Sequence, residues 1–195
     1  MKLLTIALVL LLPCLAAAPD IVGNAFGNPN APITMEIFSD FQCPACKGLH
    51  DNAVPELMRE FVIPGKVYLI DRYFPLQGHP YGMLSAEFVC AAAHVGKYEL
   101  VSNALFASQP AWSGNGQVEE TVNRVLSPAE AKKVKALLKD PAVQGEIQHD
   151  LDEGKTVPVN QTPTILVTKG FRRYPIAGVT DYGLLRSFLN DLLKK

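Results

Sequence analysis

The sequence has little of several features that would place it in a functional class. Its 195 residues include 18 basic and 19 acidic side chains, so the formal net charge is −1 and no basic excess indicates DNA or RNA as a partner. Its four cysteines are too few for a disulfide-stapled scaffold of this length. A chain of this size can bury a core large enough to fold without such staples. The composition therefore indicates a globular protein that does not bind nucleic acid.

The sequence also lacks the ligand spacing of the common zinc sites. It has one Cys-x-x-Cys pair, Cys43 and Cys46, and no second pair. The four histidines are scattered, without an H-x₃₋₅-H spacing. Tetrahedral zinc usually takes two cysteine pairs, or one pair with two histidines. We therefore predict no metal at this pair, and no cofactor other than a redox-active disulfide formed by it.

Residues 1–18 have the pattern of a secretory signal peptide. A lysine precedes a mostly apolar run from Leu3 to Leu12, and a proline and small residues follow it. The run is about half of the ~20 residues that a membrane-spanning helix needs. Pro13 stands where a lipoprotein would have a small residue before Cys14. The pattern predicts export to an oxidising compartment, after which three cysteines remain.

The rest of the chain alternates between strand and helix patterns. Segments 33–38 and 66–73 read as strands, with a helix between them that starts at Cys43 and bends at Pro55. Residues 81–154 have helical spacing throughout, including a capping box that begins at Ser127. Strands at 164–168 and 172–177 form a predicted hairpin, followed by a helix whose apolar face comprises Leu184, Leu185, Phe188, Leu189 and Leu192.

The pair Cys43 and Cys46 carries the strongest chemical signal. A structural disulfide over three residues would restrict the unfolded chain very little. At a helix N-terminus, in contrast, free N–H groups and the helix dipole stabilise a thiolate, the form that attacks disulfides. The spacing predicts Cys43 as an exposed nucleophile of lowered pKa and Cys46 as the more buried resolving thiol. Pro44 suits the first helical turn, where its missing N–H has no cost.

A second mark is Thr162-Pro163-Thr164 at the start of a predicted strand, where a proline is permitted on structural grounds alone. Together with FSDFQCPACKGLH, FPLQGHPYG and the helical stretch, QTPTILV makes the chain resemble the DsbA-like branch of the thioredoxin superfamily. The resemblance implies an α/β fold, a thioredoxin fold with an inserted helical domain. Residues 19–80 and 155–195 would form the thioredoxin-like domain, and 81–154 the insertion.

The resemblance also assigns roles to residues. It implies catalytic Cys43 and Cys46, a cis-proline at Pro163, and substrate binding by Thr162, Pro44 and Ala45. Glu36 matches a family acid that moves protons to the inner sulfur, if one extra residue before the dithiol is allowed. The implied function is an exported, periplasmic protein disulfide oxidoreductase, a monomer acting on cysteine-containing exported proteins and reoxidised by a membrane partner.

Two departures from the family leave the direction of electron flow open. Ala45 replaces a histidine found in strong oxidases, so backbone N–H groups and the helix dipole must stabilise the thiolate. Thr162 before the proline resembles reductase and isomerase members. An oxidase is our first interpretation, and the alternatives are a reductase or isomerase, or a non-catalytic thiol-dependent binding module or metallochaperone. Cys90, within an apolar helical segment, is interpreted as an inert buried thiol.

Overall fold

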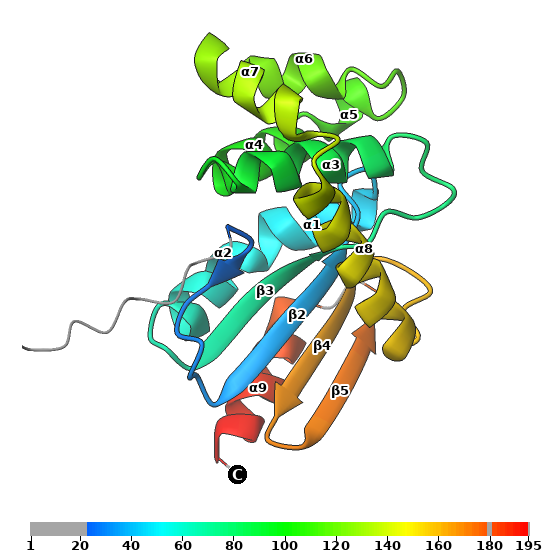
Figure 1. Cartoon of the computed structure of the whole chain (residues 1–195). Helices are drawn as coiled ribbons and strands as arrows, with labels where there is room; N and C mark the ends of the chain where they lie inside the picture. The colour runs from blue at the N-terminus through cyan, green and yellow to red at the C-terminus, as the bar shows by residue number, and fades with distance from the viewer. Residues whose placement is uncertain (1–22, 179–180, 195) are drawn as a thin grey trace, which may run out of the picture.

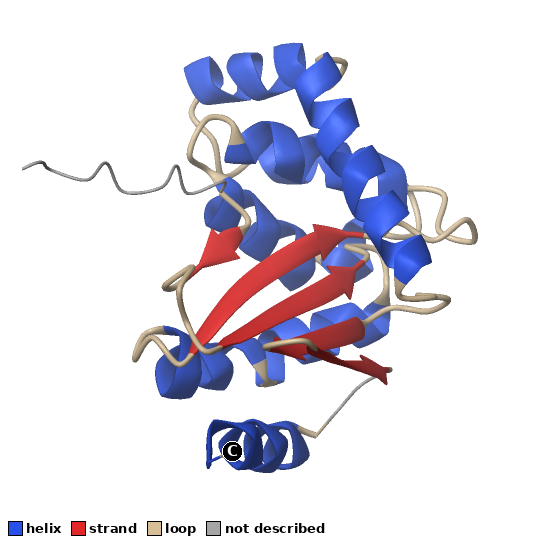
Figure 2. Cartoon of the chain, turned by 60° about the horizontal axis from the view of Figure 1, so that its bottom comes forward, coloured by secondary structure: helices blue, strands red, loops and turns tan. Residues whose placement is uncertain are grey.

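The structure is a computed structural model in which residues 23–178 and 181–194 are described, so the predicted signal peptide lies outside the described residues. Helices cover both faces of a five-stranded mixed sheet with the order β1-β3-β2-β4-β5 (Figures 1 and 2). The strands are β1 (Ala25–Phe26), β2 (Ile33–Ser39), β3 (Val67–Tyr73), β4 (Thr164–Lys169) and β5 (Arg172–Ala177). The helical elements are α1 (Pro44–Asn52), α2 (Val54–Leu57), the π-helical turn η1 (Met58–Val62), α3 (Gly82–Ala93), α4 (Tyr98–Ala107), α5 (Gln109–Trp112), α6 (Val118–Asn123), α7 (Pro128–Leu137), α8 (Pro141–Thr156) and α9 (Tyr182–Lys194).

The central strand β2 pairs in parallel with β3 and antiparallel with β4. The parallel pair is connected by α1, α2 and η1, and β4 and β5 form the predicted hairpin, with Gly170 at φ 57° in its turn. The edge strand β1 was not predicted, because two residues are too few to show a period-two pattern.

The two faces of the sheet carry different layers because successive strand residues point to opposite sides. Ile33, Met35 and Ile37 of β2 pack in one apolar cluster with α1, α2 and α9. Phe38 packs on the opposite side, against Val157 at the end of α8. The dithiol helix and α8 therefore lie on opposite faces of the sheet.

The buried face of the C-terminal helix α9 is narrower than the apolar face predicted from the sequence. Leu185, Leu189 and Leu192 are buried against the sheet, whereas Leu184 is 68% exposed. The inclusion of Leu184 was wrong because the buried stripe follows the i, i+4, i+7 positions that begin at Leu185.

Six helices, α3 to α8, lie between β3 and β4. Helices α3 to α7 form the helical block at the top of Figure 1, and α8 runs from this block down beside the sheet. The capping box of α7 is confirmed, since the Ser127 side chain accepts from the Glu130 N–H and the Ser127 N–H donates to the Glu130 carboxylate at 2.9 Å. The predicted bend near Pro55 is also present, because α1 ends at Asn52 and α2 begins at Val54. Within the described residues, no helix has the length and apolarity that crossing a membrane requires.

Candidate active site

The dithiol lies at the start of α1, after the loop that follows β2. The two sulfurs have different positions relative to the helix. Cys43 is the N-cap residue in extended conformation, Pro44 occupies the first turn, and Cys46 lies one turn into the helix. Both cysteines are unbonded thiols in this structure. Cys46 is 1% exposed, as expected for the inner sulfur. Cys43 is only 6% exposed, so the expectation of an open nucleophile was wrong.

Cys43 is covered by chain segments that are distant in sequence. Its Sγ lies 3.4 Å from the carbonyl oxygen of Thr162, and the Thr162–Pro163 peptide bond is cis, as predicted. On another side, the Gln109 amide donates to the carbonyl oxygens of Phe41 and Cys43, at 2.7 and 3.0 Å. These long-range contacts bury Cys43, and the sequence around the dithiol carries no sign of them.

The structure favours the thiolate of Cys43. The pKa of Cys43 is lowered to about 5, first by hydrogen bonding from the Cys46 thiol, and then by the Thr162 hydroxyl and the N–H groups of Cys46 and Ala45; burial opposes the shift. Backbone donors were predicted for a site with Ala45. Thr162 was predicted to bind substrate, and its hydroxyl is an additional donor that the sequence did not indicate. No partner meets hydrogen-bond geometry with this buried hydroxyl among the described residues, so it is available to the sulfur.

The loop before the dithiol is held by the buried carboxylate of Asp40. This carboxylate accepts from the N–H groups of Gln42 and Leu76, both at 2.8 Å, and lies 2.7 Å from Nδ1 of His79. The Asp40 N–H in turn points at Sγ of Cys46, at 3.5 Å. Asp40 therefore sets the geometry of the loop, a role that sequence inspection had not assigned.

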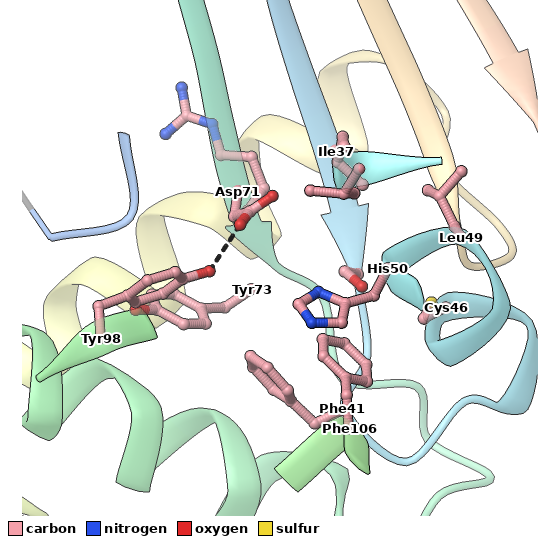
Figure 3. Close-up of a pocket in the computed structure, with 12 residues that line it drawn as sticks. Ile37, Phe41, Cys46, Leu49, His50, Asp71, Tyr73, Tyr98 and Phe106 are labelled. Atoms are coloured by element: carbon pink, nitrogen blue, oxygen red, sulfur yellow. Dashed lines mark hydrogen bonds between the residues drawn. The ribbon is translucent and has the colours of Figure 1, made fainter. Parts of the chain in front are cut away.

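Cys46 lines a small, partly open cavity behind the dithiol (Figure 3). The cavity measures about 20 Å³, which is room for about one water molecule. Phe41, Phe106 and His50 contribute to its wall, and the imidazole stacks on the Phe106 ring at 4.5 Å. Burial, followed by the proximity of Cys43, raises the pKa of Cys46 well above that of an ordinary thiol. Cys46 is therefore protonated when both sulfurs are reduced.

An acid on β3, Asp71, shares this cavity with Cys46 (Figure 3). Burial raises the pKa of Asp71 to about 6, although the Tyr98 hydroxyl donates to its carboxylate at 2.8 Å. Asp71 was absent from our sequence predictions. The sequence feature that could have revealed it is the single carboxylate within the strand VYLIDRY. Alternation along the strand places this carboxylate on the same face of the sheet as Ile37.

The predicted acid Glu36 lies elsewhere. It pairs with Arg72 at 3.3 Å, and Arg72 also pairs with Asp150 of α8 at 2.8 Å. Glu36 is seven residues before Cys43, and strand alternation sends its side chain to the α8 face, opposite Cys46. The extra residue allowed in the resemblance therefore moved this acid to the wrong face, and the proximity expected between Glu36 and the dithiol is not found.

Comparison with known proteins gives a consistent picture. Residues 20–176 match the family described as thioredoxin. Disulfide bond formation protein D of Bacillus subtilis is 23% identical over 183 residues, which cover 90% of this chain and 80% of that protein. The Na(+)/H(+) antiporter NhaA 3 of Salinispora tropica is 30% identical over 142 residues, 72% of this chain, but the match spans only 21% of the antiporter.

Solved structures share the fold. Wolbachia pipientis α-DsbA1 matches with a TM-score of 0.74 and 19% identity, over 87% of this chain and 89% of that one. Oxidised BdbD of Bacillus subtilis matches with a TM-score of 0.74 and 22% identity, over 91% and 96%. These matches include the helices inserted between β3 and β4. The chain belongs to the thioredoxin family, in its DsbA-like branch of thiol–disulfide oxidoreductases.

Proposed function

We propose that this chain is an exported protein disulfide oxidase that transfers the Cys43–Cys46 disulfide to cysteine-containing proteins. The observation that carries the proposal is the lowered pKa of Cys43, about 5. A stabilised Cys43 thiolate favours the reduced form of the pair, and a pair with a favoured reduced form is an oxidant. The pKa lies between those typical of thioredoxin, about 7, and of DsbA, about 3.5.

The reaction proceeds through two thiol–disulfide exchanges. A substrate thiolate attacks Sγ of Cys43, forming a mixed disulfide and releasing Cys46, which takes up a proton because its pKa is raised. A second substrate thiolate then attacks the substrate sulfur of the mixed disulfide and releases Cys43 as a thiolate. Two electrons pass from the two substrate sulfurs to the enzyme pair, and the substrate leaves with a new disulfide.

Asp71 is the group that we propose as the proton donor to Cys46. It shares the one-water cavity with Cys46, and its pKa of about 6 leaves a fraction of the carboxyl protonated near neutral pH. In the reverse direction, the Asp71 carboxylate accepts the proton when Cys46 becomes a nucleophile. The observed position of Glu36, paired with Arg72, offers no such path.

Substrate binding is proposed at the surface around Cys43. Pro44 is exposed and Ala45 is partly exposed beside the sulfur, and the Thr162 carbonyl, next to Pro163, faces the sulfur from the opposite side. The signal-like residues 1–18 support export, in bacteria to the periplasm, where substrates are cysteine-containing proteins. A membrane partner would reoxidise the pair, and the chain would act as a monomer without a cofactor.

The reduction potential of the Cys43–Cys46 pair tests the proposed direction. We expect a value within roughly −120 to −270 mV, between strong oxidases and thioredoxin, from equilibration with glutathione. The chain should also oxidise a reduced test protein, and the variant with Cys43→Ser and Cys46→Ser should not. A potential clearly below that of thioredoxin would favour the reductase, and no turnover at all would favour a binding module.

A further inference from the structure

A second group of reactive side chains lies in the helical block, where α3 and α8 pack against each other (Figure 1). Cys90 lies in the last turn of α3, and His94, four residues later, is the C-cap residue of that helix. The backbone of His94 is still αR, so the two side chains lie on the same side. Glu146 projects from α8 toward the same point. Its Oε2 lies 3.4 Å from Sγ of Cys90, and its Oε1 lies 2.8 Å from Nε2 of His94.

We propose that Cys90, His94 and Glu146 form a binding site for a divalent transition metal of the zinc class. One ligand atom from each of the three residues lies within 4.8 Å of the others. Ligand atoms around a tetrahedral zinc ion are separated by about 3.5 Å, given bond lengths of about 2.0–2.3 Å. The three side chains therefore need only small movements to surround an ion.

The chemistry of the three donors selects among cations. Thiolate and imidazole are ligands of zinc, cobalt, nickel and copper, whereas magnesium and calcium prefer oxygen ligands alone. Binding breaks no carbon bond and transfers no electron. The Cys90 thiol gives its proton to solvent, and the imidazole of His94 coordinates through Nε2 while its Nδ1 carries the ring proton.

The three ligand residues differ in their access to solvent. His94 and Glu146 are partly exposed, whereas Cys90 lies fully buried beneath them. Glu146 also lines an open pocket of about 280 Å³ together with His149 and Asp150. A water would supply the fourth ligand of a tetrahedral ion. The buried Tyr73 hydroxyl, which lacks a hydrogen-bond partner among the described residues, belongs to the same core cluster as Cys90.

An ion at this point would link α3 to α8. The helix α8 leads from the block back to β4, and Pro163 immediately precedes that strand. Metal binding would therefore stabilise the helical block against unfolding without entering the disulfide reaction. The site is distinct from the dithiol, so its test can proceed with the dithiol removed.

The test uses the chain with Cys43→Ser and Cys46→Ser, because a free dithiol would itself bind metal. Titration with Co²⁺ should give one ion per chain and a sulfur-to-cobalt charge-transfer band, which Zn²⁺ then removes by displacement. Added Zn²⁺ should raise the melting temperature. In the same background, Cys90→Ser should abolish the band, and His94→Gln and Glu146→Gln should each weaken affinity by at least about 10-fold.

Asp152→Asn is the matched control, because it removes an exposed carboxylate from the same helix and should leave binding unchanged. His94 is partly exposed, so His94→Gln should retain the fold, which circular dichroism verifies. Absence of bound cobalt would overturn the proposal. So would a charge-transfer band that persists in Cys90→Ser, or equal losses in His94→Gln and Asp152→Asn; the three groups would then be only a hydrogen-bonded link between helices.

Discussion

At the scale of single residues, the site compensates for the absence of a histidine between its cysteines. Ala45 contributes only its backbone N–H to the Cys43 thiolate. The Cys46 thiol and the Thr162 hydroxyl add donors, one from the same helix and one from the opposite loop. Three kinds of donor around one sulfur hold its pKa near 5 despite burial, which opposes a charged thiolate.

Replacing Asp71 tests its proposed role as proton donor to Cys46. Asp71→Asn keeps the shape and can still accept the Tyr98 hydrogen bond, but it carries no transferable proton. We expect the rate of disulfide exchange to fall by roughly 10²-fold, a typical effect of losing general acid–base catalysis. Stopped-flow oxidation of a reduced peptide measures it, and Glu36→Gln is the control that should retain the rate.

The same substitution should affect stability in the opposite direction. The pKa of Asp71 is raised on folding, so the folded chain loses stability as pH rises from about 4 to about 6. Asp71→Asn removes this penalty and should increase the free energy of unfolding at pH 7. A variant that is both slower and less stable would indicate a structural role for Asp71 rather than proton transfer.

At the scale of elements, the sequence predicted the patterned parts well. Local signals, namely alternation, turn residues and caps, predicted strands β2 to β5, the β4–β5 hairpin, the break near Pro55 and the capping box of α7. The edge strand β1 and the exposure of Leu184 did not. They depend on which neighbouring element covers a residue, and local periodicity carries no information about that.

The capping box at Ser127 makes a prediction that belongs to α7. Ser127→Ala leaves the N–H of Glu130 without its side-chain acceptor and should lower the free energy of unfolding by about 0.5–2 kcal/mol. Urea denaturation measures the loss. Ser187→Ala, at an exposed position inside α9, is the matched control and should not destabilise the chain, since alanine is the better helix former. Equal losses in the two variants would show that the cap has no energetic role.

At the scale of the whole molecule, the low pKa of Cys43 links redox state to stability. A group whose pKa is lowered on folding stabilises the folded state above its unfolded pKa, and this stabilisation is lost as pH falls through the folded value. For Cys43 the window runs from the ordinary thiol value of about 9 down to about 5. The reduced chain should therefore gain stability relative to the oxidised chain as pH rises across this window.

Paired thermal melts of the reduced and oxidised chains at several pH values measure this gain. Cys46, whose pKa is raised, opposes the effect only above the ordinary thiol pKa, so the window ends there. The variant Cys43→Ser, reduced, should show no such dependence between about pH 5 and pH 9. Parallel curves for reduced and oxidised wild-type chains would contradict the lowered pKa.

The sequence by itself determined the dithiol, its helix, and the order of the strands and helices apart from the edge strand β1. These features rest on local spacing and on residue chemistry, both of which are visible along the chain. The tertiary structure decided which acid lines the cavity behind Cys46, because a shift of one residue in a strand reverses the face to which a side chain points. It also decided that Glu146 meets Cys90 and His94. That contact depends on the packing of α8 against α3. The spacing of Cys90 and His94 carries no information about which residue of α8 lies beside them.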